Sequence, residues 1–472
     1  MKPVYLISHE VVRCNAMPCV GLSYIAAYLR SKEINVEVFD TNYLRQSPYD
    51  VLRDREPGIV GITCEARNIE EAVKIASFAK KKGHITILGG LHISLIEGQA
   101  LDYPDVDFAI TGDGEIPFYT LVKTLNEDKN DFNSIPGLIF RQHGNVKVNP
   151  QTRIENLDDL PYPDYRIAKI NNIEIYPLIT SRGCPYKCKY CTVGSISRGR
   201  WQPRSVKNVI GELKLAIERY NIKEFIIIDE NFSQRMDRAV DFCKSMIEEE
   251  INIPWSVMEG MRADKIDRNI LKLLKKAGCN SIYFGIETVE NAELEHIAGD
   301  KKMLVINRAV ELSHEEGFKV CGYFVVGLPG ATYKTVMNSM NYAKKNLDIA
   351  IFWMAIPYLN TPLYQEVIKN HKLLRNPVGI NVINSLSTQP FFETKDFSRK
   401  EMKKAHVVAN LEMGNYYFIE NWMRYKSVNF LDRLVPRIKL LMVILVYHPK
   451  FIFKFLKQQI AIKLSRPSIS PS

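Results

Sequence analysis

Three closely spaced cysteines are the residues of this sequence best suited to chemistry. Cys184, Cys188 and Cys191 follow one another at intervals of four and three residues, with no fourth cysteine and no histidine beside them. A tetrahedral structural zinc site needs a fourth ligand. Three thiolates can instead hold three irons of a 4Fe-4S cluster and leave the fourth iron open to a substrate or cofactor. The spacing therefore predicts such a cluster. A zinc knuckle that borrows a distant ligand, or three inert thiols, are the alternatives.

Basic side chains flank these cysteines in the sequence. Arg182, Lys187 and Lys189 are expected to offset the negative charge of a cluster and to favour thiolates. The remaining cysteines are scattered without ligand spacing, and we expect most of them to be small buried apolar residues: Cys14, Cys19, Cys64, Cys243, Cys279 and Cys321. Nine cysteines in 472 residues are too few for a disulfide scaffold, and the N-terminus lacks the regions of a secretory signal. A reducing cytoplasm is the expected location.

Alternating strands and helices must position the cysteine loop. Between Glu174 and Ile356, strand-like apolar runs alternate with helical periodicity in about six units. This alternation predicts an α/β fold, namely a partial or full βα barrel. The cysteine loop follows the first of these strands, over 174–180, and so lies at the end where barrel active sites form.

The first 130 residues alternate in a similar way and predict a doubly wound parallel sheet. Glycines fall where its strands should end, at Gly89 and Gly90 and again at Gly112 and Gly114, and ligands usually bind at the carboxyl ends of such strands. Tight turns from strand to helix are the alternative reason for these glycines. The predicted organisation is a sheet domain over 1–150, a linker over 151–172, a barrel over 173–395 and a helical region over 396–472.

The cysteine loop and five later segments resemble the radical S-adenosylmethionine (SAM) enzymes. The loop has the CxxxCxxC spacing of that family, with Tyr190 before the last cysteine. Further segments are similar to family motifs in the expected order along the barrel: Ile228 to Phe232, Met261 to Asp264, Phe284 to Glu287, Gly322 to Gly330, and Ile356 to Tyr364, in which Asn360 replaces a glycine and leaves the loop geometry open. The resemblance implies that the open iron binds the amino and carboxylate groups of SAM. An electron from a reductant such as flavodoxin or ferredoxin would then cleave SAM to a 5'-deoxyadenosyl radical.

Carried over residue by residue, the resemblance implies SAM contacts by Glu230, Arg262, Glu287 and Gly327. The charged members of this set also have plainer interpretations. Glu287 could cap the helix that follows it, and Arg262 could be a surface ion-pair partner. The adjacent carboxylates Asp229 and Glu230 could bind the SAM ammonium as a pair, or one of them could face solvent, and Glu230 is the one selected for the SAM contact.

The first domain resembles the cobalamin-binding domain that precedes many radical SAM barrels. The matching segments are 20–30, Gly89 to His92 and 105–115. The resemblance implies cobalamin contacts by Thr63, Arg67, Gly89, Gly90, His92, Gly112, Gly114 and Glu115. The Asp-x-His-x-x-Gly motif is absent, so we expect no histidine on cobalt and a corrin that faces the loop from Thr63 to Arg67. A vestigial domain that binds no corrin is the alternative.

The net charge of +10 belongs almost wholly to one segment of the chain. Residues 424–466 hold ten Lys and Arg and one acid, Asp432, which gives +9 and leaves +1 for the rest. Large apolar residues are interleaved with lysine there, a pattern typical of a helix lying in a membrane surface. The longest uncharged apolar run, Leu440 to Tyr447, has eight residues and is too short to span a bilayer. Burial of the tail against the barrel, or contact with nucleic acid phosphates, are the alternatives.

Together these features predict an enzyme of the cytoplasm with peripheral contact at the inner face of the membrane. The resemblance implies cobalamin-dependent methylation of an unactivated carbon, and the tail favours a hydrophobic small molecule, lipid or isoprenoid-like, as the substrate. Ring formation or rearrangement, as in the anaerobic porphyrin cyclases, is a second hypothesis. A membrane-associated protein without catalytic activity is a third.

Overall fold

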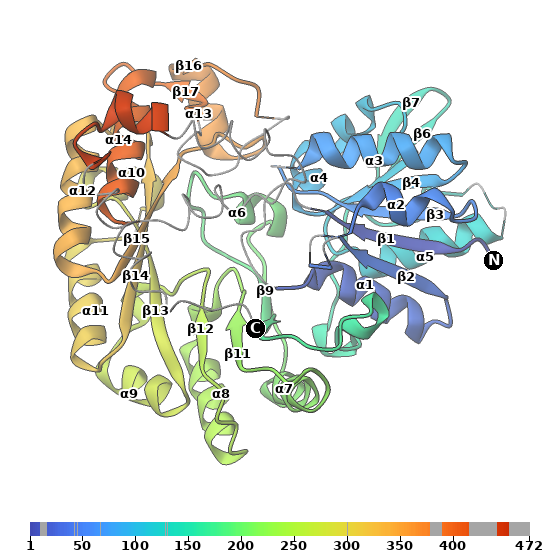
Figure 1. The fold of residues 1–472 in the computed structure, drawn as a ribbon, viewed down its shortest axis with the longest axis horizontal. Helices are drawn as coiled ribbons and strands as arrows, with labels where there is room; N and C mark the ends of the chain where they lie inside the picture. Colours follow the sequence, from blue (N-terminus) through green and yellow to red (C-terminus); the bar gives the residue numbers. More distant parts are fainter. Residues whose placement is uncertain are drawn as a thin grey trace, which may run out of the picture.

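The chain folds around two sheets that lie next to each other, the first in blue and cyan and the second in green to orange (Figure 1). The structure is a computed structural model. It describes residues 1–9, 17–41, 43–44, 46–66, 68–127, 129, 131–299, 301–377, 389–414 and 441–452.

In the described residues the N-terminal sheet has seven strands in the order β2-β1-β3-β4-β5-β6-β7. Strands β1 to β5 pair in parallel, and β6 and β7 extend the sheet in antiparallel fashion. The strands are β1 (Val4–Ser8), β2 (Val36–Asp40), β3 (Ile59–Thr63), β4 (Ile85–Gly89), β5 (Phe108–Ile110), β6 (Leu138–Gln142) and β7 (Asn145–Val148). The helices are α1 (Val20–Ser31), α2 (Pro48–Arg53), α3 (Ile69–Lys81), α4 (Leu91–Ile96) and α5 (Glu115–Asn126). The prediction of a doubly wound parallel sheet is confirmed.

Burial explains why these apolar runs are strands. All five residues of β1 are buried, as expected for a parallel strand with helices over both faces of its sheet. The strand order reverses between β1 and β3, which marks the edge where ligands bind in such sheets. Glu97 has a φ of 45°, which breaks the helical path after α4, and a short 3-10 helix (Glu97–Asp102) follows.

The second sheet is open rather than closed into a full barrel. Across the residues that the structure describes, its order is β15-β14-β13-β12-β11-β8, so β15 and β8 are edges that do not pair with each other. Its strands are β8 (Ile175–Leu178), β11 (Glu224–Ile227), β12 (Trp255–Val257), β13 (Cys279–Glu287), β14 (Lys319–Val326) and β15 (Ile349–Met354), all parallel. The partial form of the predicted barrel is the one observed.

Helices cover the outer side of this sheet (Figure 1). They are α7 (Val206–Tyr220), α8 (Met236–Glu248), α9 (Arg268–Lys276), α10 (Asn291–Ala298), α11 (Met303–Glu315) and α12 (Tyr333–Asn346). Beneath α8 the core is aromatic, with Phe225 and Trp255 stacked at a centroid distance of 5.7 Å and Phe242 edge-on to Trp255 at 5.5 Å. The remaining elements are the hairpin β9 (Ser181–Gly183) and β10 (Trp201–Pro203), α6 (Thr192–Ser197), α13 (Pro362–Asn370), β16 (Lys372–Leu373), β17 (Phe392–Glu393) and α14 (Arg399–Glu412).

Helix α14 covers the open edge at β15. It begins with a capping box between Ser398 and Glu401. The Asn410 amide donates to the Phe352 carbonyl oxygen at 2.9 Å and accepts from the Phe352 backbone N–H at 3.2 Å. A side chain thus replaces a neighbouring strand and satisfies part of the exposed edge. Of the helical region predicted over 396–472, residues 415–440 and 453–472 lie outside the described residues.

Lys403 on α14 gives a pH-dependent prediction for stability. Its side chain is 1% exposed, and burial lowers its pKa from 10.5 to about 7. Between these two pKa values the unfolded chain binds a proton that the native state does not, so the free energy of unfolding rises with pH across this window. Below about pH 7 Lys403 is charged in both states, and the full cost of burying its ammonium lowers stability. Lys403→Met is therefore expected to raise the free energy of unfolding by about 2–4 kcal/mol at pH 6, with the gain fading towards pH 10.5.

Urea unfolding of wild type and variant from pH 6 to 10 measures this gain. Lys400→Met, at an exposed position on the same helix, is the control and should change stability by less than about 0.5 kcal/mol. A gain from Lys403→Met that is the same at every pH would contradict the assignment of the penalty to a buried charge.

One part of the C-terminal tail is described, and it packs on α14. Residues 441–447 are helical, and Ile444 and Phe451 form a buried cluster with Val407 and Leu411. His448 Nε2 lies 2.6 Å from Glu412 Oε1. This part agrees with the alternative of a tail buried against the barrel, while 415–440 and 453–472, with most of the basic residues, lie outside the described residues. No helix in the described ranges is long and apolar enough to span a membrane.

Candidate active site at the domain interface

A short hairpin carries the cysteine loop. Strand β9 directly precedes Cys184 and pairs with β10 in antiparallel register, Gly183 opposite Trp201. Gly183 has a φ of 87°, and a Cβ placed on it would lie 2.2 Å from the Arg200 carbonyl oxygen. Only glycine fits where the backbone at residue 183 approaches Arg200 so closely. The sequence analysis missed the hairpin because its strands have three residues each and no alternating pattern.

The three thiols lie within electrostatic reach of one another. Cys184, Cys188 and Cys191 are each partly buried, and burial raises the pKa of each thiol, that of Cys191 to about 11. Cys188 and Cys184 further raise the pKa of Cys191. Within the described residues, no three His, Cys, Asp or Glu side chains are placed to hold one metal ion. A 4Fe-4S cluster does not need that arrangement, because each thiolate binds a different iron.

Polar groups beside the loop favour thiolates. The Asn231 amide donates to Cys184 Sγ at 3.6 Å, and the backbone N–H groups of Val193 and Gly194 lower the pKa of Cys191. Arg262 and Lys301 lower the pKa of Cys188. Two of the three cations expected near the cluster make other contacts. Arg182 pairs with Asp113 and Glu115, and Lys189 lies 3.6 Å from Glu366.

The structure separates the roles of the adjacent carboxylates Asp229 and Glu230. Asp229 is buried and accepts bonds from Thr180 N at 2.6 Å, Thr180 Oγ1 at 2.5 Å and Ser181 Oγ at 2.6 Å, so it anchors the start of the loop. Glu230 is exposed and accepts from Gly183 N at 3.0 Å. Of the two, Glu230 is the carboxylate that faces solvent next to the cysteines.

Arg262 and Glu287 also lie beside the loop. The Arg262 guanidinium is 3.9 Å from the Tyr186 ring centroid and 2.7 Å from Asp264, and its side chain is 12% exposed. Glu287 ends β13 with a φ of 67° and accepts from Lys301 Nζ at 2.8 Å. It is also hydrogen-bonded to Tyr190. The Glu287 carboxylate therefore holds the loop from the strand side, and its contact with SAM stays a prediction.

Two further residues complete the barrel side of the site. Gly327 follows β14 with a φ of 93°, and its Cβ position lies 3.0 Å from Met402 Sδ on α14. Lys301, which the sequence analysis did not select, bonds the Gly285 carbonyl oxygen at 2.8 Å as well as Glu287. It follows α10 outside every family motif, so no sequence signal singled it out. The residues predicted for SAM thus come together at the carboxyl ends of neighbouring strands.

The residues predicted for cobalamin lie at the carboxyl edge of the first sheet. Thr63 ends β3 opposite Gly89, which ends β4. Gly90 precedes α4 with a φ of 104°, and a Cβ there would lie 2.6 Å from the Cys64 carbonyl oxygen. His92 is buried on α4. Gly112 N–H donates to Ser94 Oγ at 3.0 Å. Arg67 lies outside the described residues.

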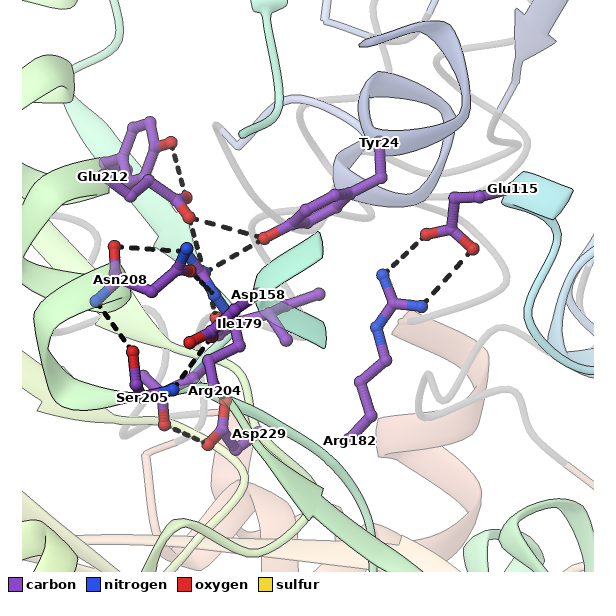
Figure 2. A network of polar contacts seen from close by, with 12 residues as sticks. Tyr24, Glu115, Asp158, Ile179, Arg182, Arg204, Ser205, Asn208, Glu212 and Asp229 are labelled. Carbon is purple, nitrogen blue, oxygen red and sulfur yellow. Dashed lines mark hydrogen bonds and ion pairs between the residues drawn. The ribbon is translucent and has the colours of Figure 1, made fainter. Parts of the chain in front are cut away.

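Two features of this edge suit a large flat ligand. The Cβ position of Gly89 has no atom nearer than 4.0 Å, and Leu91 beside it is 58% exposed. A large exposed apolar side chain at a ligand-binding edge is a suitable surface for an apolar ring. Gly114 precedes α5, and Glu115, the first residue of that helix, is buried and bonded to Arg182 (Figure 2). The Glu115 carboxylate thus contacts the other domain.

Glu259 lies between the two sides of the site. It follows β12 and is exposed, yet desolvation raises its pKa, and Glu230 and Glu65 raise it further. Glu230 belongs to the barrel side, whereas Glu65 belongs to the loop after β3. The loops that were predicted to contact SAM and cobalamin are therefore close enough to interact electrostatically.

Comparison with known protein families agrees with this arrangement. The Radical SAM superfamily matches residues 178–343, and the B12 binding domain family matches residues 12–122. The chain therefore contains a Radical SAM domain and a B12-binding domain. Its cofactors are a 4Fe-4S cluster, SAM and cobalamin.

Relatives of this radical SAM enzyme include methyltransferases. An uncharacterised methyltransferase of Pyrococcus horikoshii is 28% identical over 400 residues, which cover 82% of this chain and 85% of the relative. A cytidylyl-2-hydroxyethylphosphonate methyltransferase of Streptomyces wedmorensis is 25% identical, and the match covers 77% of this chain and 80% of the relative. An anaerobic magnesium-protoporphyrin IX monomethyl ester cyclase of Rubrivivax gelatinosus is 25% identical and covers 74% and 66%.

Solved structures show the same fold. The radical SAM methyltransferase TsrM of Kitasatospora setae, with tryptophan and a SAM analogue bound, has a TM-score of 0.66 at 19% identity and covers 78% of this chain and 76% of its own. The cobalamin-dependent radical enzyme OxsB, with aqua-cobalamin and SAM bound, has a TM-score of 0.71 at 17% identity and covers 94% and 71%.

Proposed function

We propose that this enzyme methylates an unactivated carbon of a hydrophobic small molecule. The observation that carries the proposal is the meeting of the cysteine loop with the B12-binding edge, joined by Arg182 and Glu115 at 2.7 Å. Bound together, the cofactors would supply a 5'-deoxyadenosyl radical from SAM and a methyl group on the corrin. A site that brings these two close to each other suits hydrogen abstraction and methyl transfer at one carbon.

The residues of the chain would bind and orient the cofactors. Cys184, Cys188 and Cys191 would hold the cluster, and Glu230, which is exposed beside them, would accept a hydrogen bond from the SAM ammonium. The charge of Arg262 lowers the pKa of Cys184 and would favour the SAM carboxylate beside the cluster.

The test uses the anaerobically reconstituted enzyme with cobalamin, dithionite and SAM that carries a deuterated methyl group. Formation of both 5'-deoxyadenosine and S-adenosylhomocysteine is expected, since the first reports radical cleavage of SAM and the second reports departure of its methyl group. Formation of 5'-deoxyadenosine alone, with no S-adenosylhomocysteine, would favour radical ring formation or rearrangement, which the cyclase relatives make the second candidate. Formation of neither product would favour the non-catalytic hypothesis.

We also propose contact of the tail with anionic membranes, from which a hydrophobic substrate could be drawn. The described part of the tail supports this with four large exposed apolar side chains, Leu441, Met442, Leu445 and Val446, on a helix whose other face packs on α14. Basic residues of 424–466 would add attraction of about 1 kcal/mol each near an anionic surface. Flotation with vesicles of anionic and of neutral lipid tests this. Equal flotation with and without residues 424–472 would remove the reason for a membrane-derived substrate.

A further inference from the structure

Arg182 reaches from the cysteine loop into the other domain. It lies two residues before Cys184, and its guanidinium donates to Glu115 Oε1 at 2.7 Å and Oε2 at 3.4 Å (Figure 2). It also donates to Asp113 Oδ1 at 3.1 Å. The side chains of Arg182, Glu115 and Asp113 are 15%, 4% and 9% exposed. This two-pronged ion pair forms only when the two domains are docked.

A second buried pair supports the same contact. The Arg182 guanidinium lies 5.2 Å from the centroid of the Tyr24 ring on α1. The Tyr24 hydroxyl lies 3.4 Å from Glu212 and 3.1 Å from Arg204, which pair with each other at 2.5 Å on the barrel side (Figure 2). Tyr24 of the first domain thus contacts a buried ion pair of the barrel side, and a displaced arrangement of the two domains would lose these contacts.

The chain places this pair between the two cofactor sides. Glu115 starts α5 directly after the glycine loop at the end of β5, on the side predicted for cobalamin. Arg182 belongs to β9, and its neighbour Gly183 donates to Glu230 on the side predicted for SAM. One short covalent and hydrogen-bonded path therefore connects the two sides.

Asn360 forms a second link across the interface. The side-chain amide of Asn360 donates to the Leu95 backbone carbonyl oxygen of α4 at 2.9 Å. The backbone carbonyl oxygen of Asn360 accepts from the Ser195 hydroxyl of α6 at 2.6 Å. Asn360 has a φ of 61°, a left-handed conformation that asparagine tolerates better than most residues. The side chain that replaces the expected glycine is thus used in the contact between the domains.

We propose that Arg182 is a positioning residue that sets the SAM side of the site against the cobalamin side. The inference rests on the proposed function, because its consequence concerns the methyl group. Cleavage of SAM to 5'-deoxyadenosine needs only the cluster side. Transfer of the SAM methyl group to the corrin would break the sulfur–methyl bond of SAM, place the methyl group on cobalt that dithionite has reduced, and release S-adenosylhomocysteine. This step would need both sides in register, since about 1 Å of displacement can cost about 100-fold in rate.

The test compares Arg182→Gln with wild type, both reconstituted with iron, sulfide and cobalamin and supplied with SAM and dithionite. We expect S-adenosylhomocysteine formation to fall about 10- to 100-fold while 5'-deoxyadenosine formation stays within about twofold. The milder Arg182→Lys keeps the positive charge but loses the two-pronged guanidinium contact. Its rate of S-adenosylhomocysteine formation is expected to lie between those of wild type and Arg182→Gln. The control is Arg268→Gln, which removes an arginine from an exposed pair with Glu315 and Glu316 on the outer surface.

Hydrogen exchange supplies a readout that does not depend on activity. Arg182→Gln should increase exchange over 113–118 and 181–183, and Arg268→Gln should not. The double variant Arg182→Glu with Glu115→Arg swaps the two charges of the pair. It should recover part of the lost S-adenosylhomocysteine formation. Equal loss of both SAM products, or unchanged formation of both with unchanged exchange, would overturn the proposal. If wild type forms no S-adenosylhomocysteine, the proposed function fails, and unchanged exchange in Arg182→Gln would then overturn the link between the domains independently.

Discussion

Replacing Cys191 with alanine is expected to remove the iron–sulfur cluster and reduce 5'-deoxyadenosine formation to background. Cys191 precedes α6, and its sulfur receives hydrogen bonds from the backbone of Val193 and Gly194, which orient it as a ligand. Two remaining thiolates would leave a second iron without a protein ligand. Iron and sulfide content after anaerobic reconstitution, together with 5'-deoxyadenosine formation from SAM, measure the loss.

Cys243→Ala is the matched control for this substitution. Cys243 lies on the buried face of α8, is 1% exposed and is far in sequence from the loop, so the same change should leave the cluster in place. Its cost should be limited to about 1 kcal/mol of stability from the lost packing. A Cys191→Ala protein that keeps wild-type iron and wild-type 5'-deoxyadenosine formation would contradict the assignment of the three cysteines.

The second large effect is expected from Gly183→Ala. The new Cβ would lie 2.2 Å from the Arg200 carbonyl oxygen and 3.0 Å from Ser197 Cβ, at a φ of 87°. The left-handed conformation alone costs about 1–2 kcal/mol for a residue with a Cβ. Relief of the overlap must also shift β9 or β10, and any shift moves Cys184. We expect a total loss of about 3 kcal/mol or more, together with poor incorporation of iron.

Gly199→Ala separates the cost of the left-handed conformation from the cost of the overlap with Arg200. Gly199 lies in the same hairpin with a φ of 70°, but its Cβ position has no atom within 4 Å. It should therefore lose only the conformational cost of about 1–2 kcal/mol and retain its iron. Thermal unfolding and iron analysis of both variants test the comparison, and similar losses in the two would show that the close approach to Arg200 is unimportant.

Much of the fold follows from patterns that the sequence displays openly. The buried strands of both sheets, such as β14, are short apolar runs between helices of clear periodicity, such as α7. The three cysteines could be singled out because they lie at close spacing on one short loop. The residues that position the loop could not, because Arg182 and Glu115 are 67 residues apart and meet only through the docking of two domains.

The roles of several further residues depend on contacts that the sequence does not reveal. Asp229 and Glu230 are adjacent acids, and only the structure shows that the first is buried under Thr180 and Ser181 while the second is exposed. Lys301 pairs with Glu287 across 14 residues that include a helix. Asn360 departs from the family pattern, yet its amide makes a contact between the domains that glycine could not make.

The composition of the metal site is the most direct test of this account. Anaerobically reconstituted enzyme should hold about four irons and four sulfides per chain, and addition of SAM should change the electron paramagnetic resonance spectrum of the reduced cluster, because the open iron gains a ligand. One zinc per chain without sulfide, or a cluster whose spectrum does not respond to SAM, would contradict the claim that Cys184, Cys188 and Cys191 form the centre of a radical SAM enzyme.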